Sequence, residues 1–461
     1  MRWYPVQHPS KPLTLQGILN GDRFMGIRAK ISRREFALVA GSTTLGPLAA
    51  GRLLPSVAWA KDVDKRLLLS APLTHIDWMS KDSIPGAQPG ETGFRKVWGP
   101  EGVRSMLDTC KATGWKRIHW RVFDGGRAAY HSKLMDPDGG KMEEDNYHAD
   151  NPEVLREFES FDYAHFDTLA EAVRYGHEIG LEIYAWASIN EDDHAWGTPS
   201  RFSKNHSEFR WCKRDGTIYR SQISFAFPEA MRYKLGLVEE LLDGYQIDGL
   251  FLDWIRTGDI RDNPQNDATG VANFGYEKPL VDGFKARYGV DPLSLPNGDE
   301  RWVRFRAEPQ TEFMRGVHKL VKAKRPQDVP VSVMVGHPWH YRGDFKIDGN
   351  LRGLLLDVTT WAREGLIDEA MPAGYYRDGG NAELAYQALK QETLDKVPIV
   401  LFGWLQSAEQ FLNDVQIAQR VGAKQILFWE ADYIDNQEQS AKEALQRVMC
   451  AHSAAPPSAS P

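Results

Sequence analysis

The chain is organised around residues 245–256, which read YQIDGLFLDWIR. Positions 249–255 form a short apolar run that contains a single carboxylate, Asp253. A run of this length preceded by Asp-Gly is typical of a buried strand in a parallel sheet. The C-terminal ends of such strands face the ligand site in α/β proteins. Asp253 is therefore either a candidate catalytic group or a structural acid that caps the strand or pairs with Arg256.

Strand and helix patterns alternate on both sides of this stretch. The other predicted strands are 67–76, 117–123, 181–189, 329–335, 369–375, 397–404 and 424–430. The predicted helices are 101–113, 161–179, 229–242, 278–288, 310–324, 351–364, 382–395, 408–421 and 437–448. This order predicts an α/β fold, a (β/α)8 TIM barrel with long loops at its C-terminal rim. An open doubly wound sheet would need a glycine-rich phosphate loop after the first strand, and THIDW at 74–78 is no such loop.

The composition indicates a globular protein without affinity for nucleic acid. The 461 residues are 42% hydrophobic and 26% charged, with a net charge of −7. The three cysteines, Cys110, Cys212 and Cys450, are widely spaced. This spacing excludes a disulfide framework and a cysteine-rich zinc site. We expect no metal and no other cofactor.

The N-terminal residues predict an exported protein. SRREFAL at 32–38 looks like a twin-arginine export motif, a weakly apolar stretch follows at 37–54, and Ala58-Trp59-Ala60 offers a cleavage site. The apolar stretch is too short and too rich in Gly and Pro to span a membrane. We therefore expect a signal peptide over 1–60, a barrel over 61–451 and a disordered tail over 452–461. The predicted partner is the twin-arginine export machinery, and the predicted location is periplasmic or extracellular.

Without residues 1–60 the chain loses eight basic and two acidic residues, which leaves a net charge of about −13. Such an acidic protein should not bind anionic surfaces.

Three motifs resemble those of glycosyl-hydrolase-like family 10. They are GLEIYAW at 180–186, YQIDGLFLD at 245–253, and EGLID at 364–368 followed by MP at 371–372 and YY at 375–376. The resemblance covers residues 67–429 and implies a (β/α)8 barrel that acts on glycans, with a carbohydrate as the substrate. The family usually has Asn-Pro soon after the third-strand Trp, whereas this chain has ASINED at 187–192.

Hydrolysis of a glycosidic bond requires two carboxyl groups, and the predicted strand ends supply several. We predict Asp253 at the end of strand four and Glu430 at the end of strand eight as the catalytic pair. The Phe-Trp pair before Glu430 suits a carboxyl group with a raised pKa. Other acids at strand ends are Asp77, Asp124, Glu191, Asp192 and Asp193.

Other side chains near the same rim could hold a sugar. Aromatic rings provide flat stacking surfaces, and a charged residue inside a strand needs an opposite charge. For Arg121, inside strand two, Asp253 or Glu430 could be that charge. The predicted substrate-binding residues are Arg121, Trp186, Asp192, Arg256, His337, Tyr375 and Trp404, and Trp429 lies near the same rim.

Two other classes remain open. A metal-dependent hydrolase barrel could use His75, Asp77, His119, His337 and Asp432, but such sites want a His-x-His pair on strand one, where this chain has His75-Ile76-Asp77. A non-catalytic glycan-binding barrel would have lost its acids, and the presence of Asp253 and Glu430 favours an enzyme.

Overall fold

The computed structural model describes most of the residues between 67 and 429. The described residues are 67–73, 99–124, 127–135, 165–190, 192, 200–253, 255, 267, 269–325, 329–335, 349–372, 381–404 and 408–429. The chain divides into two units, Met1–Ala58 and Trp59–Pro461. The first unit, with the predicted export motif, lies outside the described residues, as do the predicted helix 437–448 and the predicted tail.

The described residues confirm the predicted barrel. Its eight parallel strands are β1 (Leu68–Leu73), β2 (Arg117–Arg121), β5 (Glu182–Ser188), β8 (Gly249–Asp253), β9 (Val331–Val335), β10 (Glu369–Pro372), β11 (Leu401–Trp404) and β12 (Gln425–Trp429). They pair in chain order from β1 to β10, and β12 pairs with both β11 and β1. The circle closes through a parallel bridge between Ala370 and Ile399, where Val400 donates its N–H to the Ala370 carbonyl over 2.9 Å.

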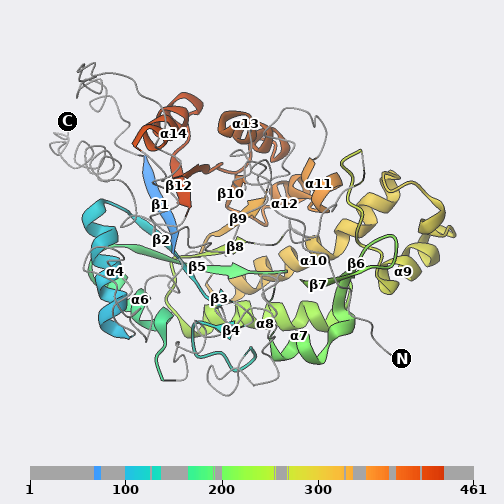
Figure 1. Ribbon diagram of the computed structural model, residues 1–461, viewed down its shortest axis with the longest axis horizontal. Helices are drawn as coiled ribbons and strands as arrows, with labels where there is room; N and C mark the ends of the chain where they lie inside the picture. The colour runs from blue at the N-terminus through green and yellow to red at the C-terminus, as the bar shows by residue number, and fades with distance from the viewer. Residues whose placement is uncertain are drawn as a thin grey trace, which may run out of the picture. The chain divides into compact units, whose positions relative to one another are not determined.

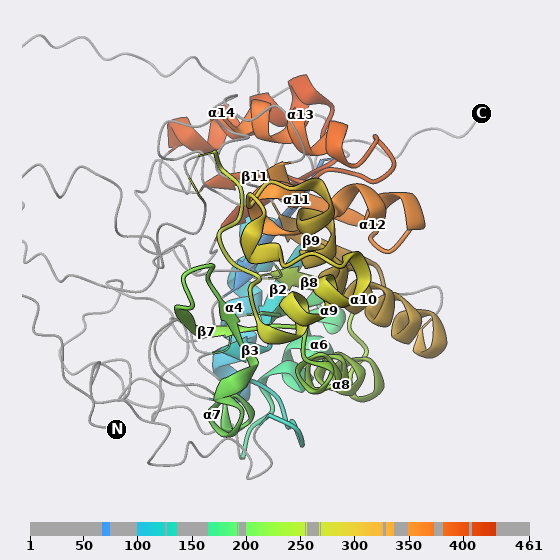
Figure 2. The same cartoon turned by 90° about the vertical axis from the view of Figure 1, so that its right-hand side faces the viewer.

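Helices cover the outside of this barrel (Figures 1 and 2). They are α4 (Pro100–Thr113), α6 (Thr168–Glu178), α8 (Pro228–Gly244), α10 (Glu300–Lys324), α11 (Gly349–Leu354), α12 (Val358–Glu364), α13 (Ala382–Glu392) and α14 (Ala408–Val421). Neighbouring helices pack in pairs, α4 with α6, α8 with α10, and α13 with α14. The longer helices, such as α6, α8 and α10, each bury one face, as an amphipathic outer layer requires.

Three predicted helices differ clearly from the observed ones. The predicted helix 161–179 begins only at Thr168, because the Asp167 side chain caps the N–H of Ala170. The predicted helix 310–324 begins ten residues earlier, at Glu300, because Asp299 caps the N–H groups of Arg301 and Trp302 and the helix continues through Pro309. The predicted helix 351–364 is split into α11 and α12. Leu355 has a left-handed φ of 57°, which interrupts the helix.

The long loops at the rim contain structure that the sequence did not predict. The loop after β5 folds into α7 (Arg201–Asn205) and a hairpin of β6 (Arg210–Cys212) and β7 (Ile218–Ile223), which lies beyond the end of β5 (Figure 1). The loop after β8 contains the predicted helix α9 (Lys278–Tyr288) at its predicted bounds. A short hairpin, β3 (Phe123–Asp124) with β4 (Arg127–Ala128), follows β2.

Two aspartates tie neighbouring strands together at the N-terminal end of the barrel. Asp248, just before β8, donates its N–H to the Ile183 carbonyl over 2.9 Å, and its carboxylate accepts the Ile183 N–H over 2.6 Å. Asp368, just before β10, makes the same two contacts with Val331, over 2.9 and 2.8 Å. The recurring Ile-Asp dipeptide therefore holds the register of two strand pairs.

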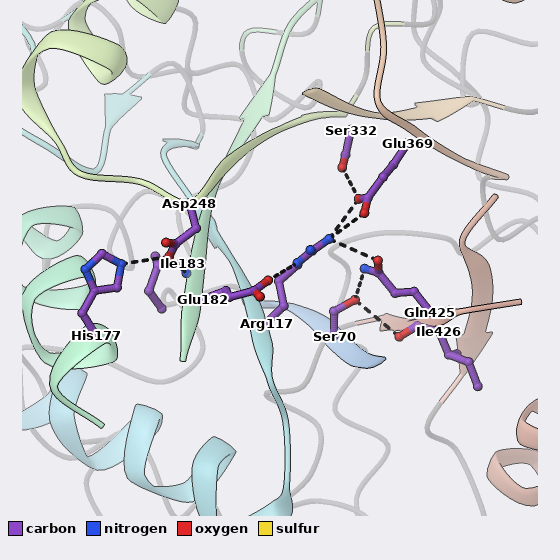
Figure 3. A network of polar contacts seen from close by, with 10 residues as sticks. All are labelled: Ser70, Arg117, His177, Glu182, Ile183, Asp248, Ser332, Glu369, Gln425 and Ile426. Carbon is purple, nitrogen blue, oxygen red and sulfur yellow. Dashed lines mark hydrogen bonds and ion pairs between the residues drawn. The ribbon is translucent and has the colours of Figure 1, made fainter. Parts of the chain in front are cut away.

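A polar network fills the N-terminal end of the barrel interior around Arg117 (Figure 3). Arg117 contacts Glu182 over 2.7 Å and Glu369 over 2.9 Å. Burial alone would lower the pKa of Arg117, but the neighbouring Glu369, Tyr184 and Glu182 outweigh it and raise the pKa above its ordinary value. Further hydrogen bonds link Arg117 to Gln425, Gln425 to Ser70, and Ser332 to Glu369. The network thus joins side chains from six of the eight strands.

An aromatic layer lies above this network. The Tyr184 ring covers the Arg117 guanidinium at 4.0 Å, and its register partner on the next strand is Gly249. A Cβ atom added at Gly249 would collide with the Tyr184 ring. The glycine of the Asp-Gly pair is therefore required by close packing of the ring and not by a turn.

Candidate active site

Asp253 lies at the C-terminal end of β8, where the sequence predicted it. Its register partner on β5 is Ser188, and Ile189 donates its N–H to the Asp253 carbonyl over 3.0 Å. The Asp253 side chain is fully buried. A buried carboxylate is costly unless it has polar partners. One partner is the indole N–H of Trp186, which donates to Oδ2 of Asp253 over 3.1 Å.

Trp186 connects this carboxylate to a cation. The Arg121 guanidinium lies 4.9 Å from the Trp186 ring centre, at a distance suited to a cation–π contact. Arg121 also donates from Nε to the Phe123 carbonyl over 3.1 Å. The predicted residues Arg121, Trp186 and Asp253 therefore come together at the ends of three adjacent strands, with the indole touching both charged groups.

A buried histidine lies in the layer below. The His119 ring centre is 4.5 Å from that of Phe251 and 5.4 Å from that of Tyr184. Among the described residues, neither ring nitrogen of His119 has a hydrogen-bond partner. Burial, and secondarily the charge of Arg117, hold the pKa of His119 well below its ordinary value. The imidazole is therefore neutral at pH 7, and the floor of the site is largely aromatic.

Asp192, a predicted substrate-binding residue, is held in a buried ion pair. Its carboxylate contacts Lys234 of α8 over 3.1 Å and accepts the Ser200 N–H over 2.9 Å. Burial alone would raise the pKa of Asp192, but the charge of Lys234 and hydrogen bonding by the Ser200 side chain outweigh it and hold the pKa at about 2. These contacts anchor the loop after β5 to α8. The substrate contact of Asp192 stays a prediction, because each of its oxygens already has a protein partner.

Several predicted site residues lie outside the described ranges. They are Glu430, Arg256, His337 and Tyr375, together with Asp77, Glu191, Asp193, His75 and Asp432 from the alternative sets. Trp404 ends β11 in register with Trp429 at the end of β12, so both lie at the rim, but their side chains are not described. The pairing of Asp253 with Glu430 therefore stays a prediction.

The structure also shows polar groups that the sequence did not single out. Ser188, Asn190 and Gln222, on β5 and the loop that follows it, are buried, and each has a side-chain atom without a hydrogen-bond partner among the described residues. Glu277, before α9, is likewise buried, and burial raises its pKa to about 8. An alternation of inward and outward residues along β5 would have indicated Ser188. Gln222 lies on the unpredicted hairpin and had no such signal.

Two negative findings apply to the described ranges alone. They contain no group of three or more His, Cys, Asp or Glu residues that could hold a metal ion. No helix within them is long and apolar enough to cross a membrane.

The strand order and the closed circle place the chain in the class of (β/α)8 TIM barrels. A glycoside hydrolase domain of PgaB (BpsB) from Bordetella bronchiseptica is similar over 83% of this chain and 99% of that domain, with 13% identity and a TM-score of 0.52. The catalytic domain of a β-amylase from Paenibacillus polymyxa is similar over 84% of this chain and 98% of that domain, with 11% identity and a TM-score of 0.54. At such low identities these likenesses show the fold alone.

The chain belongs to the glycosyl hydrolase-like 10 family, whose model matches residues 118–406. A glycosyl hydrolase of Bacillus subtilis, YngK, is 24% identical over 49% of this chain and 41% of its own length. An S-layer-related protein of Niallia circulans is 26% identical over 37% of this chain and 12% of its own length. The matched part of the chain thus spans less than half the length of either relative.

Proposed function

We propose that this protein hydrolyses glycosidic bonds in an oligosaccharide or polysaccharide, with Asp253 as a catalytic carboxylate. The observation that carries this proposal is the contact between Asp253 and Trp186 at the C-terminal end of β8. That end of a parallel barrel is where enzymes of this fold place their catalytic groups. Membership of a glycosyl hydrolase-like family supports the reaction class.

Glu430 is the proposed second carboxyl group, because it directly follows β12. In the circular strand order, three strands separate β8 from β12 on each side, so the ends of β8 and β12 face each other across the barrel. Carboxyl groups at opposite strand ends are expected to lie about 6.5–9.5 Å apart. This separation admits a water molecule and leads to inversion of the anomeric configuration. One carboxylic acid protonates the leaving oxygen while the other, as a carboxylate, activates this water. A separation of about 5–5.5 Å would instead lead to retention.

The test of this proposal is a glycan panel. Purified protein is incubated with neutral, acidic and amino polysaccharides, and released oligosaccharides are identified by mass spectrometry. We expect new reducing ends from at least one glycan, and NMR of the first products then shows whether the anomeric configuration is inverted. Absence of cleavage across the panel, by protein whose fold is verified by circular dichroism, would contradict the proposal.

We further propose that the protein is exported folded through the twin-arginine route and loses its first 60 residues. The support is the order of SRREFAL at 32–38, the apolar stretch at 37–54 and Ala58-Trp59-Ala60. Mass spectrometry of the exported protein should find an N-terminus near Lys61. Arg33→Lys combined with Arg34→Lys should block export. An intact N-terminus on protein that stays in the cytoplasm would refute this route.

A further inference from the structure

Three buried, uncharged polar side chains belong to β5 and the loop that follows it, and the pairing of β5 with β8 places one of them, Ser188, beside Asp253. Ser188 is the register partner of Asp253, just as Trp186 is the partner of Phe251. Alternate residues of a strand share a face, so Ser188 lies on the same side of β5 as Trp186, whose ring faces the barrel interior. The Ser188 hydroxyl and the Asp253 carboxylate therefore project side by side at the C-terminal end of the barrel.

Asn190 and Gln222 extend this group away from the strand ends. Asn190 donates from Nδ2 to the carbonyl of Ile255, two residues beyond Asp253. The backbone carbonyl of Asn190 accepts the N–H of Ile223 over 2.8 Å, which joins the hairpin strand β7 to the rim. Gln222 precedes Ile223 directly. A backbone hydrogen bond thus joins the segment of Ser188 and Asn190 to the hairpin strand that carries Gln222, and we call these three residues the neutral shelf.

The neutral shelf holds hydrogen-bonding groups that no other described residue uses. Ser188, Asn190 and Gln222 are 3%, 0% and 1% exposed. Among the described residues, the Ser188 hydroxyl, Oδ1 of Asn190 and both amide atoms of Gln222 have no partner. Each such group costs about 1–3 kcal/mol of stability, so a cluster of them beside a catalytic candidate calls for a functional explanation.

The neutral shelf itself carries no charge, and the charged groups described around it have both signs. Arg121 and Asp253 flank Trp186. Asp192 is paired with Lys234, and the buried Arg210 of β6, the register partner of Ile223, also lies near Asp192. A charged sugar unit buried on the shelf would need an opposite charge there, and the three shelf side chains supply none. Hydroxyl and acetamido groups, by contrast, both donate and accept hydrogen bonds, as serine and amide side chains do.

We propose that Ser188, Asn190 and Gln222 bind the hydroxyl or acetamido groups of an uncharged sugar unit next to the scissile bond. This inference rests on the proposed glycosidase function and narrows its substrate to glycans that present a neutral unit at Asp253. The three residues act in binding and specificity, whereas Asp253 acts in bond cleavage.

The test uses tetrasaccharides with sulfur in place of the glycosidic oxygen, which resist hydrolysis. Neutral tetramers of glucose and of N-acetylglucosamine are titrated calorimetrically into the wild-type protein, together with their charged counterparts made of glucuronic acid and of glucosamine. We expect at least one neutral tetramer to bind, and to bind at least tenfold more tightly than its charged counterpart.

Variants separate a binding role from a structural one. Ser188→Ala and Gln222→Leu should each weaken binding of the neutral tetramer about tenfold, or about 1.4 kcal/mol. Their melting temperatures should stay equal or rise, because each removes a buried polar group that has no partner among the described residues. Gln310→Leu is the matched control, since Gln310 on α10 is also buried with both amide atoms unpartnered among the described residues. It should leave binding unchanged.

The outcomes distinguish this inference from the proposed function. The proposed binding role of the neutral shelf would be overturned by any of three results. These are tighter binding of the charged tetramers, no binding of any tetramer, and wild-type affinity in both Ser188→Ala and Gln222→Leu. A lowered melting temperature together with lost binding would show a structural role and overturn it too. If the neutral tetramer binds through these residues but its oxygen-linked form is never cleaved, the sugar-binding role of the neutral shelf is confirmed and the hydrolase proposal is wrong.

Discussion

Trp186 donates its indole N–H to the Asp253 carboxylate over 3.1 Å, from the neighbouring strand of the barrel. This contact orients a fully buried acid at the rim and links it, through the same indole ring, to Arg121. A charged carboxylate held in one geometry is what acid–base chemistry on a bound sugar requires.

Asp253→Asn should abolish turnover while the protein stays folded. The amide keeps the shape and can still accept the Trp186 N–H, but it loses the negative charge. We expect kcat to fall by at least a thousandfold on the glycan identified by the panel, measured by release of reducing ends. Asp282→Asn, on the exposed face of α9, is the control and should have wild-type kcat. A wild-type rate in the Asp253 variant would make this acid structural.

Chelation should leave activity unchanged if the protein is a two-carboxylate glycosidase. Dialysis against EDTA followed by the same assay, with metal analysis before and after, measures this directly. A stoichiometric zinc or manganese ion that is lost together with activity would favour the metal-dependent hydrolase class instead.

Arg117→Met should destabilise the barrel strongly. It leaves Glu369 and Glu182 without their shared cation, and removal of one partner of a buried ion pair costs about 3–5 kcal/mol. Denaturant unfolding measures this loss. The double variant Arg117→Met with Glu369→Leu should lose less than Arg117→Met alone, because no unpaired Glu369 remains. Arg104→Met, which removes an exposed pair with Glu171, should cost less than about 1 kcal/mol.

His119 should make the protein sensitive to acid. Its pKa is lowered in the folded state, so below about pH 6.5 the unfolded chain binds a proton that the native state does not. The free energy of unfolding should fall by up to about 1.4 kcal/mol per pH unit, from about pH 6.5 down to the folded-state pKa. Unfolding curves of His119→Leu should lack this component. An identical pH dependence in both proteins would contradict the assignment.

Gly249→Ala should lower the stability of the protein more than Gly244→Ala, a substitution at an exposed glycine. The added methyl group would meet the Tyr184 ring, which is held over Arg117, and overpacking of this kind costs about 1–3 kcal/mol. Gly244→Ala at the end of α8 is the matched control, because a Cβ atom added there would meet no other described part of the protein within 4 Å. Thermal unfolding should show a lower midpoint for the first variant and an unchanged or higher one for the second.

The order of strands and helices could be read from the sequence because each depends on local patterns. An apolar run that begins at Asp-Gly and contains Asp253, and helices followed by Gly114 or Gly422, predicted the barrel and the position of Asp253 at a strand end. The bounds of α9 followed in the same way. Where one local signal competed with another, at Pro309 and at Leu355, the sequence alone predicted the wrong helix bounds.

Contacts between distant residues were decided only by the tertiary structure. Nothing near Arg117 in the chain indicates that it meets Glu369, and nothing near Gln222 indicates that its hairpin reaches Asn190. The same holds for Asp192, an acid in a polar loop that the fold buries against Lys234. Such pairings depend on barrel closure and strand register, which place side chains by the pairing of whole strands and not by their neighbours in sequence.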